Sequence, residues 1–273
     1  MTKGVRFIVL ALLAAACLAG TAVAQEVVFK DPTGDDDGPG TYKYPTDAVY
    51  KPGSFDITEF KMKVDGDKAD FAVTVNSNLE DPWGMKVGFA VQMIFIFIDT
   101  DHKEGSGFTK GLPGLNVAFA PADAWDRCVI LSPQPAGRVK TEVEIKAPAM
   151  KNAVLVPLRA KGVGRTISGT IPLKDLGPGD PTTWGYQVVM QSNEGFPAST
   201  DLLTRKVNEF EGQHRFGGGT DGDCDPHVLD ILAGDGKGDK SEIEAQHKML
   251  AYECNPDGTS KKTATLTMVR LKK

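Results

Sequence analysis

Residues 91–98 read Val-Gln-Met-Ile-Phe-Ile-Phe-Ile, a run in which Gln92 is the only polar residue. Side chains alternate between the two faces of a β-strand, so a strand of this composition carries apolar side chains on both faces. Both faces must then be covered to keep those side chains from water. The run therefore predicts a central, fully buried strand.

Short apolar or alternating runs recur along the chain between turn residues. They occupy residues 55–64, 69–75, 89–98, 128–131, 141–145, 153–158, 166–171, 186–191 and 263–271. Many short strands between Gly-, Pro- and Asp-rich loops are typical of an all-β, antiparallel β-sandwich. One short helix is expected near the C-terminus, at residues 241–252, because Ser241 can cap it and Glu242 and Glu244 suit its first turn.

The first 24 residues have the three parts of a secretory signal peptide. Lys3 and Arg6 precede an apolar stretch at residues 7–19, and residues 22–24, Ala-Val-Ala, offer the small side chains of a cleavage site. A membrane-spanning helix needs about 18 apolar residues or more, which exceeds this run. We therefore expect a cleaved leader and no membrane span.

The expected mature chain starts at Gln25 and forms one domain, residues 25–273, in a secreted, periplasmic or cell-surface location. Lipid attachment at Cys17 is the alternative route of export. The whole chain has 31 basic and 36 acidic residues, and without the leader 29 basic residues face 36 acidic ones, a net charge of −7. An acidic surface repels nucleic acid, so nucleic acid is not an expected partner.

Three cysteines remain after the leader. Cys224 and Cys254 both lie in polar loops near the C-terminus, whereas Cys128 lies in a strand-like run at residues 127–131. Export to an oxidising compartment permits disulfide bonds. We predict a bond between Cys224 and Cys254, with three unlinked thiols as the alternative.

Four loops combine closely spaced acidic residues with glycine, at residues 31–40, 99–107, 221–225 and 235–242. Calcium takes about six to eight oxygen ligands, and glycine permits the sharp turns that bring them together. The alternative is that Asp and Gly are ordinary turn residues, and two lysines weaken the fourth loop further. We expect at least one structural calcium ion. The candidate ligands are Asp31, Asp35, Asp36, Asp37, Asp99, Asp101, Glu104, Asp221, Asp223 and Asp225.

Sequence signatures of catalysis are missing. The chain has no Gly-x-Ser-x-Gly, no His-Glu-x-x-His and no Cys-x-x-Cys-His. Pairs of carboxylates, as used in glycoside hydrolysis, are too numerous for the sequence to nominate one. The sequence therefore favours a protein that is not an enzyme.

Aromatic residues beside turns suggest a face for sugar rings. Trp83 and Trp125 lie among acidic and turn residues, and Tyr42 and Tyr44 alternate beside the first acidic loop. Burial in the core is the competing interpretation, because tryptophan is mostly buried. These four residues are the candidate ligand-binding residues.

Residues 31–46 read DPTGDDDGPGTYKYPT, and residues 52–58 read PGSFDIT. These two stretches at the start of the mature chain closely resemble the opening of the glucodextranase C-terminal-like domain. Further stretches agree in the same order. They are residues 98–101 (IDTD), 105–107 (GSG), 112–114 (LPG), 184–187 (WGYQ), 216–219 (FGGG) and 225–230 (DPHVLD).

The resemblance implies a β-sandwich related to family 9 carbohydrate-binding modules and to DOMON domains. Members of that family typically form the non-catalytic C-terminal part of large exported amylolytic enzymes, where surface attachment or glycan binding is proposed. It implies a glycan or cell-envelope polysaccharide as partner, with a separate exported enzyme as a second candidate. Ligand specificity does not follow from a shared fold.

Two alternatives to a glycan-binding module come from other classes of protein. A more distant resemblance to the haem b subunit of ethylbenzene dehydrogenase-like enzymes would place a haem ligand at Met93, but a methionine in a buried strand is ordinarily a core residue, so we expect no haem. The other alternative is a glycan-active component that hydrolyses its ligand with an unrecognised pair of aspartates.

Overall fold

The computed structural model describes residues 25–272. The expected leader, including Cys17 and the cleavage site at Ala24, lies outside the described residues. Within them, no helix has both the length and the apolar character that crossing a bilayer requires.

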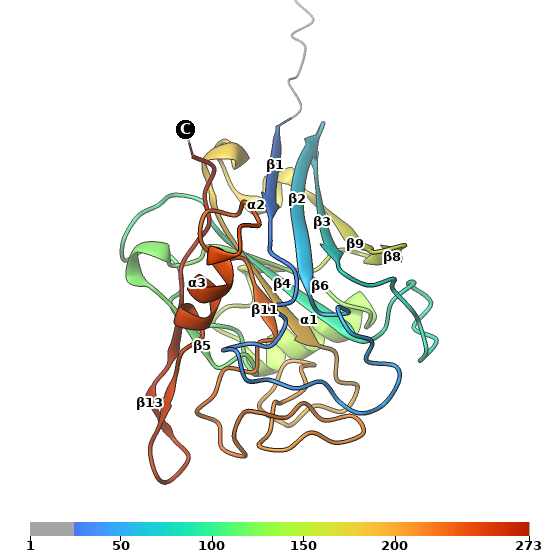
Figure 1. The fold of residues 1–273 in the computed structure, drawn as a ribbon. Coiled ribbons are helices and arrows are strands. Elements are labelled where there is room, and N and C mark those ends of the chain that lie inside the picture. The colour runs from blue at the N-terminus through green and yellow to red at the C-terminus, as the bar shows by residue number, and fades with distance from the viewer. Residues whose placement is uncertain (1–24, 273) are drawn as a thin grey trace, which may run out of the picture.

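Two five-stranded sheets form the body of the molecule (Figure 1). The first sheet is antiparallel, with the order β1 (Glu26–Lys30), β2 (Ile57–Asp65), β3 (Lys68–Val75), β9 (Thr166–Pro172) and β8 (Lys161–Val163). The second has the order β11 (Asp230–Ile231), β10 (Gly185–Ser192), β4 (Gln92–Asp99), β6 (Arg127–Leu131) and β7 (Val154–Leu155). Its pairs are antiparallel except β6 with β7. The prediction of an all-β sandwich is therefore confirmed.

Smaller elements pack around the sheets. Two further strand pairs are β5 (Val117–Phe119) with β14 (Ala264–Leu266), which is parallel, and β12 (Glu253–Cys254) with β13 (Ser260–Lys262), which is antiparallel. The helices are α1 (Ala136–Lys146), α2 (Leu173–Leu176) and α3 (Ser241–Met249), with 3-10 turns at Pro121–Asp123 and Pro181–Thr183. The hairpin of β12 and β13 projects from the body (Figure 1).

Strand β4 carries side chains of two separate cores. Ile94, Ile96 and Ile98 belong to the core between the two sheets, whereas Met93, Phe95 and Phe97 belong to a second core on the opposite face. Every residue of β4 is buried. Helix α1, β5 and β14 supply the side chains that cover this second face. The predicted central, buried strand is thus confirmed, and Met93 is one of its core residues.

The main error of the secondary-structure prediction is at residues 141–145, which belong to helix α1 and not to a strand. The polar and apolar alternation there also fits a helix, because Val139 and Val143, four residues apart, turn the same face towards the core. The predicted C-terminal helix is present as α3, but it is one of three α-helices within residues 25–272. Strand β1 was not predicted, and the predicted strands at 153–158 and 263–271 are much shorter.

Loops from distant parts of the sequence gather at one end of the sandwich. In Figure 1 the blue segment after β1 and the orange loops beyond β10 lie together at the lower end. Backbone hydrogen bonds join them, from Lys43 N to Gly217 O over 2.9 Å and from Thr46 N to Gly212 O over 2.9 Å. This end carries the first acidic loop.

Candidate functional site

Three aspartates meet where the loop after β1 passes the start of β11. Asp31 follows β1 directly, Asp35 lies further along the same loop, and Asp230 opens β11. One carboxylate oxygen from each lies within 4.8 Å of the others. The backbone N–H of Asp31 donates to Thr58 O over 3.2 Å, which holds the loop against β2. We call these three residues the inner cluster.

The inner cluster is buried and its charge has no protein partner. Asp31, Asp35 and Asp230 are 5%, 1% and 0% exposed. Both carboxylate oxygens of Asp31 and both of Asp35 lack a hydrogen-bond partner within residues 25–272. None of the three forms an ion pair with a described residue. Leaving an isolated carboxylate in such surroundings costs several kcal/mol, so the arrangement calls for a counter-charge.

Asp230 and a fourth carboxylate, Asp56, complete the site from the neighbouring strands. Asp230 Oδ2 accepts from the N–H of Ile57 over 2.6 Å. Asp56 is 1% exposed, and its Oδ2 accepts from Gly34 N over 2.9 Å and from Asn76 Nδ2 over 3.0 Å. Its Oδ1 has no partner among the described residues. Asp56 thus offers one further free oxygen beside the cluster.

Burial and mutual repulsion raise the pKa of all four carboxyl groups. Burial first, and then the neighbouring carboxylates, raise the pKa of Asp31 and of Asp230 well above the ordinary range. Burial with the charge of Asp56 raises the pKa of Asp35 to about 7. Burial raises the pKa of Asp56 to about 6, although hydrogen bonds from Asn76 and Gly34 oppose the shift. These groups hold their charges only at a cost, which a nearby cation would offset.

The loop that carries Asp35 is fixed by residues from outside it. The side-chain amide of Gln246, on α3, donates to the backbone oxygen of Asp35 and to Gly38 O, and its own oxygen accepts from Ile231 N over 2.9 Å. Gly38 has φ 62°, and a Cβ there would lie 2.3 Å from the ring of Tyr42. Glycine is therefore required at this turn. The cluster is consequently built into a rigid frame.

The chemistry of the inner cluster suits a hard divalent cation. The atoms that it could offer to a metal are all carboxylate oxygens, the ligands that calcium and magnesium prefer. Neither histidine nor cysteine belongs to the group, so it does not have the nitrogen and sulfur ligands typical of zinc. If an ion is held here, Asp31, Asp35 and Asp230 would be its ligands, with Asp56 beside them.

Two other predicted ligands in this loop turn away from the inner cluster. The hydroxyl of Tyr44 donates to Asp36. Asp37 Oδ1 lies 3.2 Å from Nε2 of His247 on α3. The structure therefore brings Asp31 and Asp35 together but not Asp36 and Asp37. The sequence analysis did not name Asp230 and Asp56 as candidate ligands, although both lie in stretches that carry the family resemblance, residues 225–230 and 52–58.

A second group of three aspartates, the outer cluster, consists of Asp99, Asp101 and Asp126. Two of its members belong to the predicted calcium loop at residues 99–107, which follows β4. An arginine side chain already compensates part of its charge. Arg270 Nη2 lies 2.6 Å from Asp99 Oδ2. Asp126 accepts from both the N–H and the hydroxyl of Thr100, over 2.8 and 2.7 Å.

Most carboxylate oxygens of the outer cluster thus have hydrogen-bond or ion-pair partners. The other predicted ligands do not come together in a comparable group. Glu104 is exposed. In the third loop Asp221 accepts from Glu209 N over 3.1 Å, Asp223 pairs with Lys206, and Asp225 accepts from the Thr220 hydroxyl over 2.7 Å. Among the described residues, three or more acidic side chains come close enough to share a metal ion only in the inner and outer clusters.

The candidate sugar-binding rings differ in exposure. Trp125 is fully buried against Phe97 and Phe108, so the expectation of an exposed ring there is wrong. Tyr42 is 6% exposed, with its hydroxyl bonded to Pro226 O. Tyr44 is half-buried and packs edge-on against Phe55. Trp125 and Tyr42 are therefore core residues, and Tyr44 is exposed only in part.

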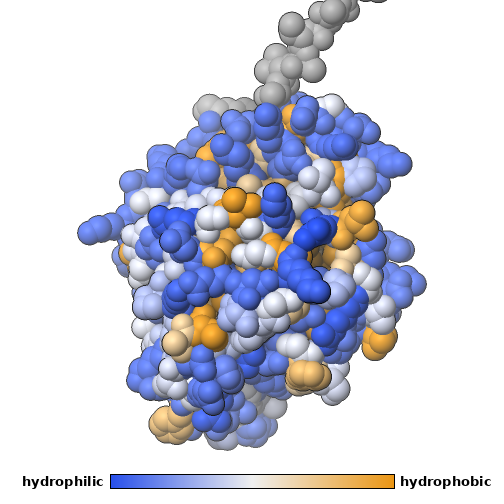
Figure 2. Space-filling view, turned by 90° about the vertical axis from the view of Figure 1, so that its right-hand side faces the viewer, coloured by the Kyte–Doolittle hydropathy of each residue, from blue (hydrophilic) through white to orange (hydrophobic). Residues whose placement is uncertain are grey.

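Trp83 is the one candidate ring with a substantial exposed surface, 38%. It packs edge-on against Tyr50, with the ring centroids 6.3 Å apart, and Tyr50 in turn contacts the ring of His214. The face of the molecule drawn in Figure 2 is mostly hydrophilic, with apolar side chains gathered in small groups. Trp83 is therefore a partly exposed ring that rests on a buried tyrosine.

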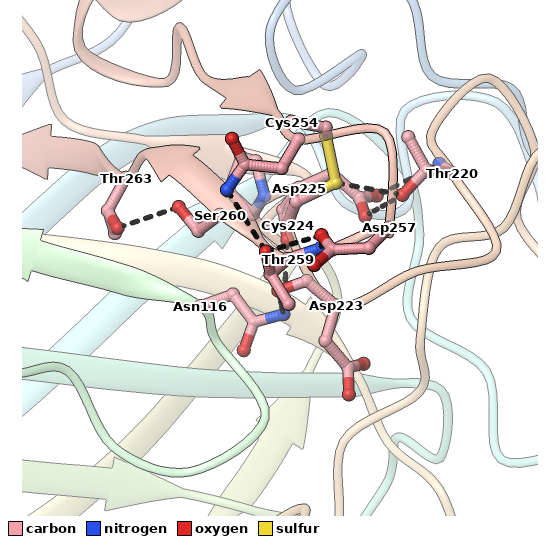
Figure 3. The surroundings of a disulfide bond; sticks show 12 residues. Asn116, Thr220, Asp223, Cys224, Asp225, Cys254, Asp257, Thr259, Ser260 and Thr263 are labelled. Atoms are coloured by element: carbon pink, nitrogen blue, oxygen red, sulfur yellow. Dashed lines mark hydrogen bonds between the residues drawn. A yellow bond between two sulfur atoms is a disulfide. The ribbon is translucent and has the colours of Figure 1, made fainter.

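The predicted disulfide is present between Cys224 and Cys254, with Cα atoms 5.4 Å apart. It joins the third acidic loop to β12 and lies among polar side chains that include Asn116 and Asp223 (Figure 3). Cys128 is free and buried. Closing a chain segment of this length stabilises the folded state by about 3 to 4 kcal/mol on the chain-entropy model.

A family model described as the C-terminal binding-module, SLH-like, of glucodextranase matches residues 27–269. The matched range includes the inner cluster, the outer cluster and the disulfide. No curated protein matches the chain.

Proposed function

Because this chain belongs to the family of SLH-like C-terminal binding modules of glucodextranase, we propose that it is an exported, non-catalytic module that binds a glycan or cell-envelope polysaccharide and holds a structural calcium ion. The family match carries the glycan part of this proposal. The buried, unpaired carboxylates of the inner cluster carry the calcium part.

Calcium at the inner cluster would stabilise the folded state and would have no catalytic role. The cluster joins the loop after β1 to β11, and Gln246 links the same loop to α3. A cation bound to Asp31, Asp35 and Asp230 would neutralise charge that no described basic residue neutralises. A ligand that binds only the folded state stabilises that state in proportion to the logarithm of its concentration.

Of the four rings predicted from the sequence, Trp83 has the largest exposed surface. Its exposed part can contact the apolar side of a sugar ring, and its contact with Tyr50 holds it in place. An aromatic group of this kind binds through contact area with little loss of side-chain freedom. Trp83 is therefore the residue of the predicted four that we retain for contact with the polymer.

Export is proposed from the sequence of the first 24 residues and is consistent with the Cys224–Cys254 bond. Disulfides persist in oxidising compartments and are rare in the cytosol. Polysaccharides of the cell envelope are accessible in the same compartments.

Affinity electrophoresis tests the proposed function. The protein, with calcium present, is run through native gels containing dextran, soluble starch or purified cell-envelope polysaccharide, with albumin as a non-binding reference. Retardation relative to albumin in at least one gel is expected. Unchanged mobility in all of them contradicts the glycan-binding proposal.

The absence of catalysis is tested on the same polysaccharides. We expect no release of reducing sugar during prolonged incubation with purified protein. Steady release that follows the protein through purification would instead favour a hydrolase with an unrecognised pair of aspartates.

A further inference from the structure

A groove of about 740 Å³ lies beside the disulfide, away from both aspartate clusters. Its walls come from the loop that leads into β5, the end of α1, the loop at residues 199–201, the third acidic loop and the β12–β13 hairpin. The volume lies within the range of small-ligand sites, about 300 to 1,000 Å³. The aromatic candidates of the sequence analysis do not line it.

Cross-links hold these walls in place. Asn116 Nδ2 donates to Asp223 O and to Asp225 O, over 3.2 Å each, and the disulfide ties the same loop to β12 (Figure 3). On the other side, Lys146 Nζ donates to Asp201 O over 2.7 Å. A site whose walls are fixed before binding loses less conformational entropy when a ligand enters.

Five of the side chains that line the groove carry hydroxyl groups. The hydroxyls of Thr109 and Ser199 have no hydrogen-bond partner within the described chain, so each can both donate and accept. Thr200 donates to Asp201 Oδ1 over 2.8 Å, which leaves its lone pairs free to accept. Ser260 and Thr263 lie 3.0 Å apart and share one hydrogen bond, so one proton remains available. Mixed donors and acceptors of this kind complement hydroxyl groups of a ligand.

Apolar groups are placed to meet the carbon skeleton of the same ligand. Leu112, Pro113, Val117 and Ala118 line the groove, and Ile145 at the end of α1 is 70% exposed. An exposed side chain of this size beside a polar groove offers a surface for the C–H face of a sugar ring. Removing such paired apolar surfaces from water is favourable.

Two of the charged side chains that line the groove form ion pairs with residues outside it. Lys146 pairs with Glu142 over 2.7 Å, and Asp223 pairs with Lys206. Among the described groove residues, Lys110 and Asp201 carry charges without an ion-pair partner. One free ammonium group and one free carboxylate leave no excess charge of either sign, which favours a neutral ligand rich in hydroxyl groups.

We propose that this groove binds a short segment of a neutral glycan through the hydroxyls of Thr109, Ser199, Thr200 and Ser260, with a sugar ring resting on Ile145. This inference rests on the proposed glycan-binding function and specifies a site for it that is separate from Trp83.

The test fills the groove from two of its walls. Thr109→Trp and Ser260→Trp replace exposed side chains, so the fold should tolerate both. Thr265→Trp is the matched control, because Thr265 is exposed on the adjacent strand β14 but does not line the groove. Each variant is run in the dextran, starch and envelope-polysaccharide gels, after its melting temperature has been compared with that of the wild type.

Each groove-filling variant is expected to bind the retarding polysaccharide at least tenfold more weakly than the wild type, with Thr265→Trp unchanged. Ile145→Ser should weaken binding about threefold to tenfold. Wild-type retardation that survives both groove-filling substitutions overturns the groove proposal but leaves the glycan-binding function standing. If the wild type is retarded in none of the gels, both proposals fail together.

Discussion

The inner and outer clusters are built from the same residue type but differ in what compensates their charge. The inner cluster has four carboxylate oxygens, from Asp31 and Asp35, without any partner among the described residues. In the outer cluster, Asp99 has an ion pair with Arg270 and accepts from the N–H of His102 over 2.9 Å. The inner cluster has no basic partner among the described residues, and the outer cluster has an arginine from the chain itself.

The difference teaches that spacing of aspartates does not identify a metal site. Both loops have closely spaced Asp and Gly, and both bring three carboxylates together. What distinguishes them is whether buried oxygens are satisfied, which depends on residues far away in the sequence. Arg270 lies near the C-terminus, more than 140 residues from every member of the outer cluster.

Chelation of calcium should have the largest effect, because it acts on the inner cluster. At a free calcium concentration about 1,000 times Kd, the ion would contribute about 4 kcal/mol to the free energy of unfolding. For a domain of this size that corresponds to a decrease of about 10 °C in the melting temperature. Differential scanning calorimetry with EDTA, and then with excess calcium, measures the loss and its recovery.

Asp35→Asn provides the control for the chelation experiment. Removing one of the repelling carboxylates should raise the melting temperature in EDTA above that of the wild type, and should lower it below the wild type in calcium. A variant with the same calcium response as the wild type would contradict a role for Asp35 in binding.

Replacing Arg270 should make the outer cluster resemble the inner one. Arg270→Gln leaves the buried Asp99 carboxylate without its cation, at a cost of about 3 kcal/mol or a decrease of about 6 to 12 °C in melting temperature. Added calcium should then stabilise this variant more than it stabilises the wild type. Lys272→Gln is the matched control, because it removes an exposed ion pair with Asp235 and should change little.

His227, which follows the third acidic loop and is 1% exposed, should make the free energy of unfolding depend on pH. Burial first, and then the charge of Lys206, lower the pKa of His227 to about 4, while the charge of Asp223 opposes them. Because the unfolded state binds this proton more tightly, its contribution to stability is fully present above about pH 6.5 and is lost as the pH falls towards 4. The difference between the two pKa values corresponds to about 3 kcal/mol.

Melting temperatures of wild type and His227→Gln between pH 4 and pH 7.5 measure this contribution. The wild type should lose more stability than the variant on acidification. The exposed His214→Gln serves as the reference. Equal pH dependence of wild type and His227→Gln would show that His227 is not the group responsible.

The smallest expected effect concerns the surface and not the clusters. Trp83→Ala should weaken binding to the retarding polysaccharide about threefold to tenfold and leave the response to chelation unchanged. Phe210→Ala, which removes another exposed aromatic side chain, is the matched control. Undiminished retardation of Trp83→Ala would remove Trp83 from the proposed binding surface.

Local patterns made much of the fold predictable. The apolar run of β4 predicted its burial on both faces, and the polar context of Cys224 and Cys254 predicted their pairing. The strand predicted at 141–145 was wrong, because five alternating residues fit a helix with Val139 and Val143 on one face equally well. Short windows do not separate the two periods.

The site was predictable only in part. Asp31 and Asp35 share one loop, and their spacing suggested calcium. Asp230 reaches them only because β11 pairs with β10, and Asp56 because β2 pairs with β1. Contacts between residues so far apart in the sequence depend on the order of strands in the sheets. Residue spacing along the chain does not specify that order. Arg270 escaped notice for the same reason.

Calcium titration by isothermal calorimetry on metal-free protein tests the central claim most directly. The account predicts one strongly bound calcium ion per chain in the wild type, its loss in Asp35→Asn, and its retention in Asp99→Asn, the isosteric change in the outer cluster. A wild type that binds no calcium, or an Asp35→Asn variant that binds it as tightly as the wild type, would contradict the account.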